Sequence, residues 1–265
     1  MDIYPMARQM LVLLALTAGL WLLHIYGPVL PTAAIAAAWL LLCVVLARAL
    51  FLRARLRRRA WLGLYFHPRG SLFTLLRGGL LMALVQILLA AGLALLTITA
   101  VLRSTDPLIW TLLLAMALLL PPLQSLTQRQ LQGQASSLYL QALAWQITST
   151  LLGLLLVIAL TWHAFLQMYP DFAAVTLEQA VWHMVGQQQA RSPQLLTLLQ
   201  VAAAGDGLRL WLAQQLLPTP GPSLWQSLGW LLVLAQEALF VWSYLLLCRG
   251  LTGSFEPLRD ERASE

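Results

Sequence analysis

A single carboxylate in an apolar stretch is the group in this sequence most able to do chemistry. Glu237 lies in the apolar run 224–248, within the stretch LLVLAQEALFVW. A carboxylate at the centre of a bilayer costs at least ~2.5 kcal/mol, so it needs a partner or a purpose. An acid held in such a site can exchange a proton or bind a cation, and Glu237 is therefore a candidate ion-path residue.

The same carboxylate could instead join two helices. Gln236 is its neighbour in sequence, and Gln86 is expected at a similar depth in another span. A protonated Glu237 could hydrogen-bond Gln86, while Gln146 and Thr148 offer further polar partners. We favour this helix–helix role, because one intramembrane acid without a second acid or a basic relay is a poor transport path.

Three histidines raise the question of a metal or haem site. His24, His163 and His183 all fall on one predicted face of the membrane, where imidazole rings could act as ligands. No second histidine lies one turn away from any of them, so their spacing matches no known site pattern. We therefore expect no metal and no cofactor. A haem- or metal-binding redox membrane protein remains a second alternative.

A run of arginines is the strongest charge feature. All sixteen basic residues are arginine, the net charge is +6, and the stretch RARLRRR is the densest part. Because this charge lies beside apolar spans, lipid headgroups or a docked partner protein explain it, and nucleic acid does not. The arginines of this cluster are Arg53, Arg55, Arg57, Arg58 and Arg59.

Other catalytic patterns are missing from the sequence. It has no glycine-rich nucleotide loop, no serine–histidine or cysteine–histidine pairing and no pair of intramembrane aspartates. The two cysteines, Cys43 and Cys248, fall within predicted spans without the spacing of a metal site or a disulfide framework. We therefore expect no catalytic residues and a protein that is not an enzyme.

Apolar runs must position all of these groups. Sixty per cent of the 265 residues are hydrophobic and 10% are charged, which predicts an all-α, polytopic membrane protein with a single membrane domain, 1–265. The fourth run is short, because Pro121 and Pro122 are expected to stop its helix, and it could be re-entrant. The expected spans are 10–26, 29–51, 71–102, 107–122, 138–166 and 224–248.

The segment 168–223 is expected to be a large extracytoplasmic loop with short amphipathic helices in the interface. One helix is predicted over 176–187, and Ser192 followed by a proline marks the start of the next. The sequence Gly-Asp-Gly at 205–207 is expected to end that helix. A further short helix is predicted over 208–217, before the chain returns to the last span.

The distribution of arginine predicts the orientation. With the arginine run in the cytoplasm, thirteen of the sixteen arginines lie on the inner side, and both termini are cytoplasmic. Only Arg103, Arg191 and Arg209 then lie outside. The N-terminal run is interpreted as a retained span, and 249–265 as a cytoplasmic tail. The expected location is the inner (plasma) membrane of a bacterium.

The leading functional hypothesis is a non-enzymatic integral membrane subunit of a larger assembly. Its partners would be the lipid bilayer and other membrane protein subunits. The alternative is a transporter, permease or channel subunit with a polar path around Glu237 and Gln86. The layout of six spans, inner termini and a large loop before the last span is similar in topology to permease subunits of ABC-2-type exporters. That resemblance carries no motif.

Overall fold

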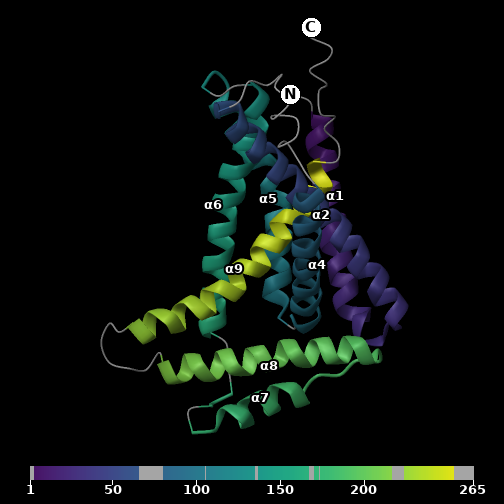
Figure 1. The fold of residues 1–265 in the computed structure, drawn as a ribbon, viewed down its shortest axis with the longest axis vertical. Helices are drawn as coiled ribbons and strands as arrows, with labels where there is room; N and C mark the ends of the chain where they lie inside the picture. The colour runs from purple at the N-terminus through teal and green to yellow at the C-terminus, as the bar shows by residue number, and fades with distance from the viewer. Residues whose placement is uncertain are drawn as a thin grey trace. The chain divides into compact units, whose positions relative to one another are not determined.

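The computed structural model shows an all-helical chain (Figure 1). It describes residues 3–65, 80–104, 106–134, 137–166, 170–172, 174–216 and 224–253. The chain divides into two compact units. Unit 1 is formed by Met1–Ile35 and Thr99–Trp242, and unit 2 by Ala36–Ile98 and Ser243–Glu265.

Most of the helices belong wholly to unit 1. They are α1 (Ile3–Tyr26), the short η1 (Gly27–Val29), α5 (Pro107–Leu131), α6 (Ser137–Leu166), α7 (Leu177–Gly186) and α8 (Pro193–Leu216). Three further helices contribute one end to unit 1 and the remainder to unit 2. They are α2 (Thr32–Tyr65), α4 (Leu80–Arg103) and α9 (Leu224–Thr252).

A bundle of α1, α5 and α6 forms the centre of unit 1, with α5 packed against both of the others. The ring of His24, in the last turn of α1, lies 5.3 Å from the ring of Trp110 in the first turn of α5. His163, near the end of α6, contacts Asp106, the N-cap of α5. The end of α1, the start of α5 and the end of α6 therefore share one end of the bundle, called here the His24 end.

The last turn of α4 also lies at the His24 end. The ring nitrogen Nδ1 of His24 is 3.0 Å from the carbonyl oxygen of Val101. At the adjoining turn, a Cβ on Gly27 would come within 2.2 Å of a methyl carbon of Leu102. The α1–α2 turn and the α4–α5 turn are thus packed closely together, and a larger residue at position 27 would require the Leu102 side chain to shift.

Helix α8 runs across the direction of α5 and α6 (Figure 1). Its N-terminal end is fastened to the α1–α2 turn: the hydroxyls of Thr32 and Ser192 are 2.8 Å apart, and the Arg191 N–H donates to the Pro28 carbonyl over 2.9 Å. Ser192 also caps the helix by accepting a bond from the Leu195 N–H.

The C-terminal part of α8 is fastened to the segment that follows α6. The indole N–H of Trp211 donates to the Val175 carbonyl over 3.0 Å. The Gln214 side chain accepts a bond from the Phe172 N–H and donates one to the Pro170 carbonyl. Helices α7 and α8 pack on each other. These contacts make the α7–α8 pair an ordered part of unit 1.

Unit 2 contains the remaining parts of α2, α4 and α9. The indole N–H of Trp39 on α2 donates to the Ala91 carbonyl on α4 over 3.2 Å. A Cβ on Gly250 of α9 would lie 2.5 Å from the Val45 carbonyl oxygen of α2. The two backbones therefore approach closely, as small residues allow at interfaces between membrane helices.

The predicted fold class, an all-helical polytopic membrane protein, is confirmed. Among the described residues, six helices are long and apolar enough to cross a membrane. They are Met6–Val29, Thr32–Arg55, Met82–Arg103, Pro107–Leu131, Tyr139–Ala164 and Pro193–Gln215. The last of these is α8, the least apolar of the six. The predicted span 224–248 lies in α9, whose side chains are described from residue 234 onward.

The predicted stop of the fourth span at the double proline was wrong. Helix α5 continues through Pro121 and Pro122 as far as Leu131. The backbone φ of proline suits a helix, and an apolar setting offers the chain no solvent partners that would favour unwinding. At 25 residues α5 is long enough to cross a bilayer, so a re-entrant segment is unnecessary.

Helix α2 is longer than the predicted span 29–51. It continues through the arginine run to Tyr65, because arginine is a good helix former. One other predicted boundary was also wrong. Helix α8 does not break at 205–207 or restart at residue 208. Neither glycine there adopts a positive φ, so both fit a continuous helix. The start of the predicted third span at 71–79, the return segment 217–223 and most of the predicted tail, 254–265, lie outside the described residues.

Candidate functional site

Glu237 on α9 faces an arginine on α8. Its Oε1 atom is 3.8 Å from the NH1 atom of Arg209, and the two side chains are 20% and 15% exposed. This separation allows charge attraction but is too long for a hydrogen bond. Among the described residues, the buried Nε and NH1 atoms of Arg209 have no hydrogen-bond partner. The pair is therefore held by electrostatics more than by directed bonds.

A second ion pair lies one turn away along α8. The Asp206 carboxylate is 2.5 Å from the guanidinium of Arg103, the last residue of α4, and both side chains are mostly buried. Residues three apart on a helix lie on the same side, so Asp206 and Arg209 project together toward the bundle. Helix α8 is thereby linked by charge to α4 and to α9.

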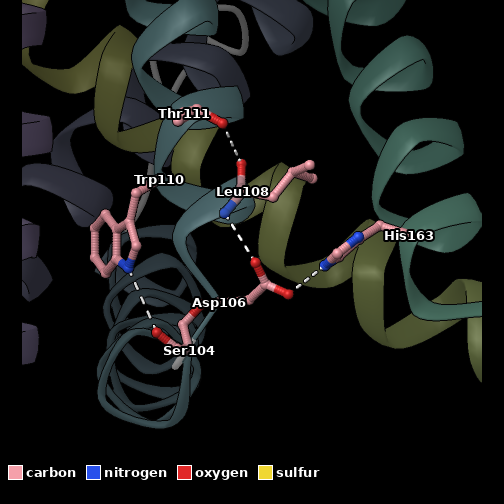
Figure 2. A network of polar contacts seen from close by, with 6 residues as sticks. All are labelled: Ser104, Asp106, Leu108, Trp110, Thr111 and His163. Atoms are coloured by element: carbon pink, nitrogen blue, oxygen red, sulfur yellow. Dashed lines mark hydrogen bonds and ion pairs between the residues drawn. The ribbon is translucent and has the colours of Figure 1, made fainter. Parts of the chain in front are cut away.

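A third pair joins α5 to α6 (Figure 2). One oxygen of Asp106 accepts the Leu108 N–H over 2.9 Å and so caps α5. The other oxygen lies 2.5 Å from Nε2 of His163. Nearby, the Trp110 indole N–H donates to the Ser104 carbonyl over 3.4 Å. One carboxylate therefore both starts a helix and holds it against its neighbour.

These six side chains form what we call the charge layer of unit 1. Each acid faces a base on a different element, which is how charges are accommodated where water is scarce. The arrangement links helices by charge attraction. At the two carboxylate–arginine pairs, an incoming ion could bind only by displacing the acid or the arginine from its partner. The members are Arg103, Asp106, His163, Asp206, Arg209 and Glu237.

The polar residues expected around Glu237 are only partly gathered there. Gln236 is exposed. Gln86 belongs to unit 2, while Glu237 belongs to unit 1, so a hydrogen bond between them stays a prediction. Thr148 is buried and its hydroxyl lies 3.0 Å from that of Thr127, which ties α6 to α5.

The remaining polar candidate on α6 is Gln146, which is exposed. Its amide donates to the Thr150 hydroxyl on the same helix over 3.3 Å. Because both residues belong to α6, this hydrogen bond does not join α6 to a second helix. A role in an ion path stays a prediction.

The three histidines lie apart, each with its own contacts. His24 lies at the Val101 carbonyl, and His163 at Asp106. The His183 ring is 3.0 Å from the Gln187 amide and meets the Phe172 ring edge-on. Within the described ranges, no group of three or more His, Cys, Asp or Glu side chains could hold a metal ion.

The arginine run lies on the C-terminal part of α2, in unit 2. Arg57 is exposed, and the Arg58 guanidinium lies 3.8 Å from the sulfur of Met82 on α4. The side chain of Arg59 lies outside the described residues. Contact of this run with lipid headgroups or with a partner protein stays a prediction.

Most of the charge layer was not anticipated. In the sequence, Asp206 falls in the predicted Gly-Asp-Gly helix break, and Arg103 and Arg209 stand out only as arginines on the outer side. The available signal was an acid and a base three residues apart, at 206 and 209, inside an otherwise apolar helical pattern. Comparison with protein-family models, curated proteins and solved structures found no match to this chain.

Proposed function

We propose that this polytopic membrane protein is a non-enzymatic subunit of a larger membrane assembly. The observation that supports the proposal is the internal pairing of Asp106, Asp206 and Glu237 with bases on other helices. Ion pairs that are mostly buried can help to select one arrangement of helices. Glu237, the group best suited by sequence to carry an ion, is thus engaged in holding α9 to α8.

A transporter or channel subunit is the second candidate, and Arg209 is the residue that favours it. Two of its nitrogen atoms are buried and have no hydrogen-bond partner in the described part of the chain, although Glu237 is only 3.8 Å away. A guanidinium with spare donors could exchange Glu237 for a passing anion. This function requires that the pair opens during each cycle, whereas the subunit function requires that it stays closed.

The proposed location is the inner membrane of a bacterium with both termini in the cytoplasm. The thirteen-to-three arginine asymmetry supports this orientation. A cysteine introduced at Gln189, an exposed residue before α8, should react with an impermeant thiol reagent on intact cells. Reaction only after permeabilisation would show that the orientation is the opposite of the one proposed.

Purification from native membranes in mild detergent tests the subunit proposal. Stable co-purification of the same membrane proteins at constant stoichiometry is the expected result. The purified chain should then be reconstituted alone into liposomes and assayed for ion flux, with Glu237→Gln as the matched variant. Flux by the lone chain that disappears in this variant would favour the transporter. An absorption spectrum checks the redox alternative, which predicts a Soret band or bound metal.

A further inference from the structure

Helix α8 meets the His24 end of the bundle at three separate points along its length. At its start, Ser192 contacts Thr32 at the α1–α2 turn. In its middle, Asp206 binds Arg103 at the α4–α5 turn. Near its end, Gln214 bonds to the backbone that follows α6. Each of these three partner segments connects or follows helices at the same end of the bundle.

The spacing of these points determines the direction of α8. From Ser192 to Gln214 the helix rises about 33 Å, at about 1.5 Å per residue. A helix parallel to α5 and α6 would carry those two residues to opposite ends of the bundle. Because both contact the same end, α8 must run across it, as Figure 1 shows.

Helix α8 carries both buried and exposed apolar side chains. Leu195, Leu199 and Ala203 are buried, whereas Val201 is 65% exposed and Leu208 is 41% exposed. Positions 201 and 208 are two turns apart and lie on the same side of the helix. A helix that lies flat on a membrane places its exposed apolar residues in the boundary between headgroups and acyl chains.

Two tryptophans on the helices that precede α8 are also exposed. Trp162, near the end of α6, is 69% exposed, and Trp182 on α7 is 64% exposed. Exposed tryptophans are typical of the membrane interface. Helix α6 is long and apolar enough to cross the bilayer, so Trp162, near its end, is placed where a membrane interface is expected.

We infer that α8 does not cross the bilayer but lies in the interfacial layer of the phospholipid membrane at the His24 end, with Val201 and Leu208 in contact with lipid. Glu237, bound to α8 through Arg209, lies at the same interface and not at the bilayer centre. Water and headgroups near an interface make charged groups far less costly than at the centre. The charge layer is then located at the level where the helices of the bundle emerge from the membrane.

Site-directed thiol labelling distinguishes a flat α8 from a spanning one. In a chain with Cys43 and Cys248 replaced by alanine, single cysteines are introduced at Gln189, before α8, and at Gln215, at its end. Both should react with an impermeant reagent from the same side of the membrane. A cysteine at Gln134, in the turn between α5 and α6 at the other end of the bundle, should react from the opposite side.

A depth measurement provides the second test. Nitroxide labels at Val201, near the middle of α8, and at Leu151, near the middle of α6, are compared in phosphatidylglycerol–phosphatidylethanolamine vesicles; both residues are more than 60% exposed. Val201 should be more accessible to a polar relaxation agent and less accessible to oxygen. Labelling of Gln215 from the Gln134 side, or equal depth at the two nitroxides, would overturn the inference.

Discussion

Arg209 and Glu237 face each other from α8 and α9, with NH1 and Oε1 3.8 Å apart and both side chains mostly buried. One turn away on α8, Asp206 is bound to Arg103. Removing either member of such a pair leaves an uncompensated charge, which is more harmful than removing both. The difference between single and double variants therefore measures how strongly the two charges interact.

The first prediction is a double-mutant cycle at this pair. Glu237→Gln and Arg209→Gln should each lower the free energy of unfolding by about 1–2 kcal/mol, less than for a fully buried pair because both groups retain some solvent contact. The double variant should lose clearly less than the sum. Denaturant unfolding in mixed micelles measures all four proteins, and strictly additive losses would show that the two charges do not interact.

The second prediction concerns the Asp206–Arg103 pair. Asp206→Asn should destabilise unit 1 by about 1–2 kcal/mol, because Arg103 loses its anionic partner in a poorly solvated position. Glu178→Gln, at an exposed site on α7, is the matched control and should change stability by at most about 0.5 kcal/mol. Thermal unfolding of the two variants in the same detergent compares them. Equal melting temperatures would argue against an anchoring role for Asp206.

The third prediction separates the two functions of Asp106. Asp106→Asn keeps an oxygen that can cap α5, whereas Asp106→Ala loses both the cap and the contact with His163. The alanine variant should therefore be less stable than the asparagine variant by about 1 kcal/mol. Unfolding curves of both variants provide the measurement. Equal losses in the two variants would mean that charge, and not capping, is the dominant contribution.

The fourth prediction uses two glycines of the same helix. A Cβ at Gly207 would lie 2.9 Å from the Cα of Val181 and 3.0 Å from the Ala180 carbonyl oxygen, so Gly207→Ala should force α7 and α8 apart and cost about 1–3 kcal/mol. Gly205 has open space around it, and Gly205→Ala should stabilise α8 by about 0.5–1 kcal/mol. Opposite shifts in melting temperature are expected. Shifts of the same sign would contradict the close α7–α8 packing.

Local patterns in the sequence were enough for the helical class and for many helix positions. Apolar run length predicts α1 and α6 well, and the Ser-Pro pair at 192–193 correctly marks the start of α8. These features depend on interactions within a few residues, which a sequence displays directly. The same local rules failed at Pro121–Pro122 and at 205–207, because packing and an apolar environment overrode the ordinary helix-breaking tendency of those residues.

The charge layer and the direction of α8 were decided by tertiary structure. Sequence identified Glu237 as an acid in need of a partner, but the partner is Arg209, 28 positions earlier, and Asp206 is bound to Arg103, more than a hundred positions earlier. Hydropathy describes how apolar a helix is and cannot tell a helix that crosses a bilayer from one that lies on it. That choice depends on where both ends of α8 are bound, and those contacts exist only once the distant turns of unit 1 have come together.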